Sequence, residues 1–201
     1  MAKIITIAHQ KGGVGKSTLA INLALCFQDQ LTVALVDTDL QGSLYHIRED
    51  FPELAIIGVD KFADIQQLDY DLIVVDTPPY LSSRLPELFR YSDFILVPTK
   101  AGFFDIMAIR STLALIQEAQ QQTPGTKAGI VFNMVKPRSG ITQEVAELLQ
   151  SLNTPLLATR IHDRVSIARS SMTGGILNSG DKKAKDEMMA LTEEVVDRIA
   201  S

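Results

Sequence analysis

A glycine-rich segment near the N-terminus combines the residue types that hold phosphate groups. Residues 8–20 read AHQKGGVGKSTLA, with Gly-Lys-Ser at residues 15–17. Glycines let several backbone N–H groups turn toward one anion, and the start of a helix adds its positive dipole. Lys16 would meet the β- and γ-phosphates, Ser17 would bind Mg²⁺, and Thr18 would contact the α-phosphate. The segment therefore predicts a site for a nucleoside triphosphate with Mg²⁺.

This loop departs from the standard phosphate-loop motif at one position and carries a second lysine. The strict pattern G-x-x-x-x-G-K-[ST] needs glycine at position 10, where this chain has Gln10. The pattern present instead is K-G-G-x-G-K-[ST], which runs from Lys11 to Ser17. Lys16 already supplies the cation expected in this motif, so Lys11 needs an explanation of its own. The alternative to a functional Lys11 is a solvated loop lysine.

Three aspartates stand at or just after the ends of apolar runs. Asp37 and Asp39 are two residues apart in LVDTDLQGS, and Asp76 ends the apolar part of IVVDTPP. Phosphoryl transfer needs a carboxylate near Mg²⁺ and a group that orients the attacking water. Aspartates at strand ends meet both needs, although a strand-end or helix-cap role is the alternative for Asp76.

Apolar, β-branched runs alternate with helical patterns along the chain. Strands are predicted at residues 3–8, 31–37, 70–76, 93–98, 127–133 and 154–161, with a weaker one at 55–59. Helices are predicted at residues 16–30, 105–122, 142–152 and 181–200. Strands that are apolar on both faces and alternate with helices imply a parallel sheet covered on both sides.

The predicted fold is an α/β fold: a doubly wound, mostly parallel twisted sheet flanked by helices, in one domain over residues 1–201. Right-handed crossovers bring the carboxyl ends of the strands to one edge, where such sheets bind ligands. Because the first strand runs directly into the glycine loop, we expect the loop and the three aspartates to meet at this edge.

The motifs resemble those of the ParA/MinD family of deviant Walker A ATPases, in the SIMIBI class. HQKGGVGKST resembles the ParA side of that family, DTD its Walker A′ motif and VVDTPP its Walker B motif. The resemblance implies a P-loop NTPase fold, ATP and Mg²⁺ as cofactors, and an ATP-dependent homodimer. In such a dimer Lys16 serves the nucleotide of its own subunit, and Lys11 reaches the nucleotide of the other. The implied nucleotide-binding residues are Lys11, Gly12, Gly13, Val14, Gly15, Lys16, Ser17 and Thr18.

The same resemblance assigns roles to the aspartates. Asp37 supports the Mg²⁺ shell, Asp39 orients the attacking water, and Asp76 holds a magnesium-bound water. The implied catalytic residues are therefore Lys11, Lys16, Asp37 and Asp39, and the implied metal-site residues are Ser17, Asp37 and Asp76. ParA-like members usually read D-x-D-P-Q here, whereas this chain has Leu40 before Gln41.

Two further residues, Asn133 and Asp105, also match family positions. Asn133, at the end of GIVFN, stands where many members keep a polar residue that faces the adenine; a turn asparagine at a strand end is the alternative. Asp105 lies in DFILVPTKAGFFDIMAI, which resembles the next strand and helix of the family. The resemblance gives Asp105 a place at the dimer face and in packing.

Composition excludes several other classes of protein. The formal net charge is −5, which argues against a wholly basic nucleic-acid coat. The single cysteine, Cys26, lies in an apolar helical run and is expected to be a small buried residue. It cannot provide the cysteine cluster ligands of the nitrogenase iron proteins, and no apolar stretch is long enough for a membrane helix.

Basic residues are concentrated late in the chain. ParA relatives bind DNA without sequence preference through such residues, so the resemblance implies DNA contacts by Arg160, Arg164 and Arg169. Binding of this kind neutralises phosphates and weakens with salt. Scattered, solvated surface charge is the alternative for each arginine.

The last predicted helix distinguishes the chain from MinD-like members, which end in a basic amphipathic segment that lies on a membrane. Its apolar stripe is Met188, Leu191, Val195 and Ile199, and acidic residues flank it. An acidic face is repelled by anionic lipid, so this helix is expected to pack on the core rather than on a membrane.

The expected function is that of a small ParA-type ATPase without an N-terminal DNA-binding domain, cytoplasmic and associated with the nucleoid. Its ATP-bound dimer would bind DNA until a ParB-like or adaptor partner stimulates hydrolysis, most simply in plasmid or chromosome segregation. Positioning of protein cargo is one alternative. A metabolic ATP-dependent phosphotransferase or ligase on the same scaffold is another, and a module that binds nucleotide without hydrolysis is a third.

Overall fold

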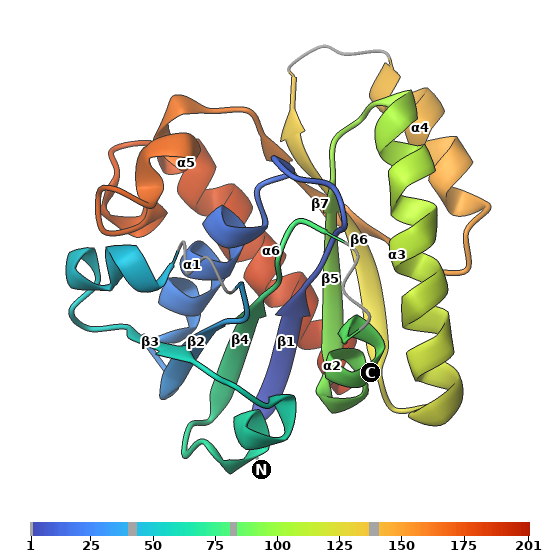
Figure 1. The fold of residues 1–201 in the computed structure, drawn as a ribbon. Helices are drawn as coiled ribbons and strands as arrows, with labels where there is room; N and C mark the ends of the chain where they lie inside the picture. The colour runs from blue at the N-terminus through green and yellow to red at the C-terminus, as the bar shows by residue number, and fades with distance from the viewer. Residues whose placement is uncertain (1, 40–43, 81–83, 137–140) are drawn as a thin grey trace.

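Seven parallel strands form one sheet in the described part of the chain (Figure 1). The computed structural model describes residues 2–39, 44–80, 84–136 and 141–201. The strands are β1 (Lys3–Ile7), β2 (Val33–Asp37), β3 (Ala55–Gly58), β4 (Leu72–Asp76), β5 (Phe94–Thr99), β6 (Lys127–Val135) and β7 (Leu156–His162). Their order across the sheet is β3-β2-β4-β1-β5-β6-β7, which confirms the predicted doubly wound parallel fold.

Helices cover both faces of this sheet. The α-helices are α1 (Lys16–Phe27), α2 (Leu85–Tyr91), α3 (Phe103–Gln122), α4 (Ile141–Gln150), α5 (Val165–Ser170) and α6 (Lys182–Ala200). Three short 3₁₀ turns accompany them: η1 (Tyr45–Asp50), η2 (Phe62–Gln67) and η3 (Ile176–Asn178). One apolar core joins the sheet to α1, α5 and α6, and a second joins its other face to α2, α3 and α4.

Strand residues alternate between the two cores. Ile5 and Ile7 of β1 belong to the first core and Ile4 to the second, and all three are at most 2% exposed. Burying one such side chain stabilises the fold by about 1.5–3 kcal/mol. Because both faces are used, the central strands β2, β4 and β5 are buried throughout, which is why they stand out as apolar runs in the sequence.

The structure confirms the predicted strands, including the weak one that forms β3, and adds two short helices that were not predicted, α2 and α5. Helix α2 has only 7 residues and has Pro86 in its first turn, so it is too short to show a helical period. Helix α3 begins at Phe103, two residues before the predicted start.

Helix α6 packs on the sheet, as predicted. Met188, Leu191 and Val195 are fully buried, and Ile199 packs against the same core. Its glutamates bond to the edge strand β7: Glu194 accepts from the backbone N–H groups of Ala158 and Thr159, and Glu187 from that of His162. No helix in the described residues is long and apolar enough to cross a membrane.

A buried asparagine fastens α1 to the segment around α5. Asn22 is fully buried, and its amide group donates to Ser170 Oγ at 2.7 Å and to the carbonyl of Thr18 at 2.7 Å. Its Oδ1 accepts from the N–H of Ile176 at 2.6 Å. One side chain therefore links α1 to Ser170 of α5 and to Ile176 at the start of η3, and also satisfies a carbonyl of α1 itself.

We expect Asn22→Ala to lower the free energy of unfolding by about 3 kcal/mol, because buried polar groups that it pairs lose their partner. Urea denaturation followed by circular dichroism measures this change. Asn153→Ala, at an exposed turn, is the control and should stay within about 0.5 kcal/mol of the wild type. Equal small effects of the two substitutions would contradict the assigned role of Asn22.

Candidate functional site

The glycine loop joins β1 to α1 at the carboxyl edge of the sheet. Gly13 and Gly15 have φ angles of 69° and 85°, a left-handed conformation that favours glycine, and Gly15 caps the start of α1. Gly12 and Gly13 are exposed, whereas Val14 is fully buried and fixes the loop to the core. The loop thus presents backbone at the surface beside the N-terminus of α1, the arrangement that binds anions.

Asn133 supports this loop from below. It is 2% exposed, and its amide group donates to the carbonyl of Val14 at 2.7 Å. A Cβ added at Gly15 would collide with the same amide group, so glycine at this position and asparagine beneath it fit together. Asn133 is therefore close to the loop, where it holds the backbone; contact with an adenine stays a prediction.

Lys16 lies buried under the loop. It is 6% exposed, and burial lowers the pKa of its ammonium group, while Asp76 and Asp39 oppose that shift. A buried ammonium group with incomplete compensation attracts an anion. This is the property expected of the lysine that meets the phosphates of its own subunit.

Asp76 and Ser17 form a pair beside Lys16. Ser17 Oγ donates to Asp76 Oδ2 at 2.6 Å, and the other carboxylate oxygen is buried without a partner among the described residues. Burial raises the pKa of Asp76 to about 7, against the opposing effects of Ser17 and Lys16. A cation or a metal-bound water beside Asp76 would relieve this cost and keep the carboxylate charged.

The register of the sheet places Asp37 next to Asp76. These two residues are paired across β2 and β4, and Asp76 is also level with Ile7, the last residue of β1. Asp37 accepts from the N–H groups of Asp39 at 2.9 Å and Leu44 at 3.0 Å, so it organises the segment that carries Asp39. Leu40, where the chain departs from the family pattern, lies outside the described residues.

The donor set fits Mg²⁺ bound together with phosphates. No cluster of three or more His, Cys, Asp or Glu that would hold a metal is present in the described residues. Mg²⁺ keeps several waters and uses one or two protein ligands plus phosphate oxygens. Ser17 with the unpartnered oxygen of Asp76 provides such a partial shell, and Asp37 lies beside it.

Lys11 pairs with a carboxylate of helix α3. Its Nζ is 2.5 Å from Asp105 Oδ1, and its side chain is 39% exposed, whereas that of Asp105 is 11% exposed. A Cβ at Gly102 would lie 2.5 Å from the second oxygen of Asp105, so the glycine leaves room for this carboxylate. The two lysines of the loop therefore occupy different environments, one buried and one accessible.

His9 is a site residue that sequence reasoning missed. It is 1% exposed, and its Nδ1 accepts from the backbone N–H of Lys11 at 2.8 Å. Burial and the nearby lysine Lys16 lower its pKa to about 4, so the ring is neutral at pH 7. In the sequence, His9 stands two residues before Lys11 in the motif. A lone histidine at a strand end, however, indicates no particular role.

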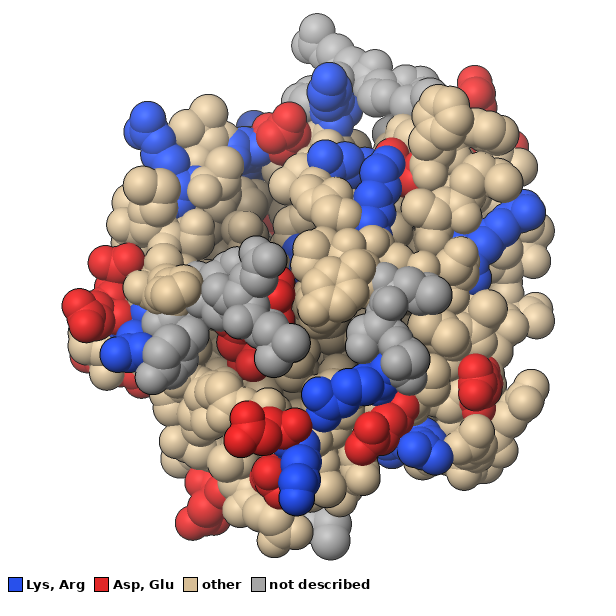
Figure 2. All heavy atoms as spheres, viewed as in Figure 1, with Lys and Arg blue, Asp and Glu red and all other residues tan. Residues whose placement is uncertain are grey.

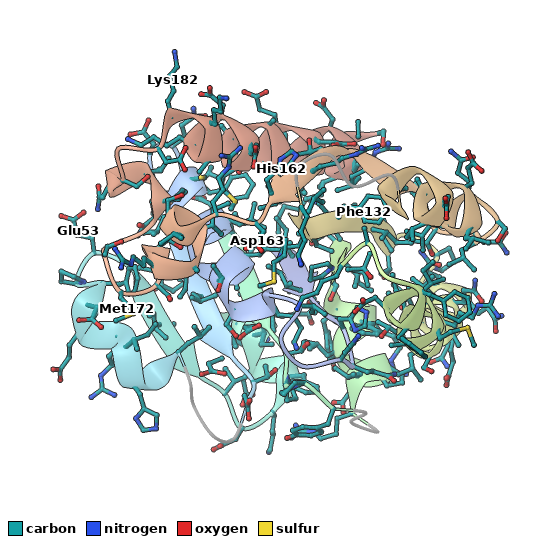
Figure 3. The ribbon with its side chains drawn as sticks, turned by 90° about the horizontal axis from the view of Figure 1, so that it is seen from above. Glu53, Phe132, His162, Asp163, Met172 and Lys182 are labelled. Carbon is teal, nitrogen blue, oxygen red and sulfur yellow. The ribbon has the colours of Figure 1, made fainter. Side chains whose placement is uncertain are left out.

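The three late arginines do not lie in equivalent environments. Arg164 donates to Glu187 Oε1 at 2.8 Å, and Arg160 lies over the ring of Phe132 at 6.0 Å; Arg169 on α5 is exposed. Figure 2 shows Lys and Arg side chains along the upper edge of one face, interspersed with acidic ones. Seen from above that edge, His162 at the end of β7 lies near the centre of the molecule, and Lys182 points outward (Figure 3).

The chain matches the family described as the CobQ/CobB/MinD/ParA nucleotide binding domain over residues 5–177. It belongs to that family. This range includes the loop, the three aspartates and Asn133, so the resemblance seen in the motifs extends over most of the chain.

Individual relatives cover almost the whole chain. It is 30% identical to Maintenance of carboxysome distribution protein A of Halothiobacillus neapolitanus, over 96% of this chain and 95% of that protein. It is 26% identical to the chromosome-partitioning ATPase Soj of Thermus thermophilus, over 97% and 96%. Septum site-determining protein MinD of Pyrococcus horikoshii, solved with Mg-ADP, has the same fold, with a TM-score of 0.73 at 20% identity over 100% of this chain and 98% of that one.

The buried neutral state of His9 predicts a pH-dependent contribution to stability. Between its ordinary pKa of 6.5 and about 4, the unfolded chain binds a proton that the folded chain does not, so stability is lost as the pH falls. At pH 4.5 this loss is about 2.5 kcal/mol.

We therefore expect the wild type to lose about 2.5 kcal/mol more unfolding free energy than His9→Asn when the pH falls from 7.5 to 4.5. Urea denaturation at the two pH values measures it. Asp76, whose raised pKa acts in the opposite direction, is present in both proteins and cancels in the comparison. A difference independent of pH would contradict the buried neutral ring.

Proposed function

We propose that this chain is an ATP- and Mg²⁺-dependent positioning ATPase of the ParA type, which acts as a dimer that closes over two nucleotides. The observation that carries this proposal is the contrast between Lys16 and Lys11. Lys16 is buried under its own loop, while the side chain of Lys11 is partly exposed and pairs with Asp105 of α3. A triphosphate gains its full set of cations when the Lys11 of a second copy joins Lys16.

The surface beside Lys11 supports closure on a second copy. Phe103, Phe104 and Met107, at the start of α3, are 60%, 78% and 49% exposed, and the two rings pack edge to face. These apolar side chains flank Asp105, the partner of Lys11, at the same edge as the loop. Exposed apolar patches of this kind mark protein contacts.

Hydrolysis would use groups already gathered at the edge. Ser17 and Asp76 would bind Mg²⁺ with its waters, Asp37 would support that shell, and Asp39 would orient the attacking water. The paired lysines would stabilise the charge that develops on the transferred phosphoryl group. Intact Asp37, Asp39 and Asp76 favour turnover over simple nucleotide storage.

The proposed cycle couples this dimer to DNA and to cargo. The ATP dimer would bind nucleoid DNA without sequence preference, and a ParB-like or adaptor protein on the cargo would stimulate hydrolysis and release. We propose DNA segregation as the leading role. Positioning of a protein assembly is the second candidate, favoured by the 30% identity to a carboxysome distribution protein.

Lys11→Ala should still bind ATP through Lys16 but fail to form stable dimers. Phosphate release should fall by about a hundredfold or more, because a trans-acting cation at the γ-phosphate is lost. Sedimentation velocity with ATP–Mg²⁺ and a phosphate-release assay measure the two effects. Lys61→Ala is the control, because Lys61 is an exposed lysine directly before η2. Turnover at the wild-type rate in Lys11→Ala would overturn the proposal.

Retention of DNA by the protein should require ATP. It should fall steeply between about 50 and 200 mM salt, because binding through neutralised phosphates weakens as salt replaces the released counterions. The slow-hydrolysing Asp39→Ala protein provides the ATP dimer for a filter-binding assay. Arg169→Ala should weaken retention more than Arg164→Ala, because Arg164 is already paired with Glu187. Salt-independent binding by the protein without nucleotide would contradict the scheme.

A further inference from the structure

An apolar groove runs along the outer side of α1 and α6, at the end of α1 away from the nucleotide loop. It consists of two adjoining hollows of about 400 and 740 Å³, and both are lined by Cys26 and Met189. Leu31, Met189 and Val196 are 40%, 39% and 46% exposed there. Three large apolar side chains are therefore accessible to solvent around one groove.

The rim of the groove is acidic. Five carboxylates line the two hollows: Asp29, Asp50, Glu53, Glu193 and Asp197. None of them forms a salt bridge within the described part of the chain, and no Lys or Arg is among the described lining residues. Figure 3 shows one of them, Glu53, pointing outward at the margin of the molecule. The groove thus combines apolar contact area with uncompensated negative charge.

We infer that this groove docks a basic amphipathic helix of a partner protein. Apolar residues at positions i, i+3 or i+4, and i+7 of such a helix would fill the hollows on either side of Met189, and flanking Lys or Arg side chains would meet the carboxylates. Complementary charge of this kind selects the partner and speeds its association.

Charge decides against other occupants. DNA and anionic lipid surfaces are repelled by five unpaired carboxylates. A second copy seated symmetrically would bring the same acidic rim against itself, because a two-fold interface pairs identical patches. A cationic protein segment is the ligand class that the rim attracts.

The location of the groove keeps it independent of the nucleotide site. Helix α1 has 12 residues, so its two ends lie about 18 Å apart, with Lys16 at the far end from the groove. A partner bound here covers neither the loop nor the surface around Lys11. Docking therefore does not depend on the proposed ATP cycle, and it is measured without nucleotide.

The probe is a fluorescently labelled amphipathic helix of about five turns built from leucine and lysine, and fluorescence anisotropy with the full chain measures its affinity. Val196→Ser, which removes apolar contact without changing the charge, and Glu193→Lys, which reverses one rim charge, should each weaken binding by about tenfold. Both substituted positions, Glu193 and Val196, are exposed, and thermal unfolding checks that the variants fold. The same peptide with glutamate in place of lysine should not bind.

Glu118→Lys is the matched control, because it makes the same charge change at an exposed position of α3, on the other face of the sheet. It should bind the probe as the wild type does. If Glu118→Lys and Glu193→Lys lost equal affinity for the probe, the probe would be attracted only by the net charge of the protein, and the proposal would be overturned. So would binding of the acidic peptide, or sedimentation showing that Val196→Ser abolishes self-association of the chain.

Discussion

The cost of keeping charged groups under the glycine loop governs the arrangement of the site. Asp76 at the carboxyl end of β4 and Lys16 at the start of α1 are almost fully buried, and burial disfavours the charged form of each. The parallel register fixes Asp76 beside Asp37, while Asn133 and Val14 fix the loop above them. Anion and cation binding at this edge relieves a cost that the folded chain already carries, which couples ligand binding to the stability of the site.

Lys11, the second lysine of the loop, does not carry the cost of burial that Lys16 carries. Lys11 stays near the surface, paired with Asp105, and its backbone N–H is held by the neutral ring of His9. A loop with two buried ammonium groups would repel itself in the absence of phosphate. Separating the two lysines, one under the loop and one against α3, gives a loop that is stable before ligand binds and still has a cation to offer.

Much of this organisation was predictable from the sequence, because buried parallel strands are apolar on both faces and glycine loops have a strong signature. The seven strands, the loop and the strand-end aspartates fall in this class. Helix α2 was not predictable because 7 residues contain too little periodicity. His9, the Lys11–Asp105 pair and the engagement of Arg164 by Glu187 depend on contacts between residues far apart in the chain, which no local pattern encodes.

The carboxylates of α6 have a consequence for assembly. A strand at the margin of a sheet offers unpaired amide groups to any neighbouring chain, which is a common route to aggregation. On β7 the amide groups of Ala158, Thr159 and His162 are already occupied by Glu194 and Glu187. Growth of fibres by strand addition at this margin is therefore discouraged, and association between subunits is left to surfaces formed by side chains.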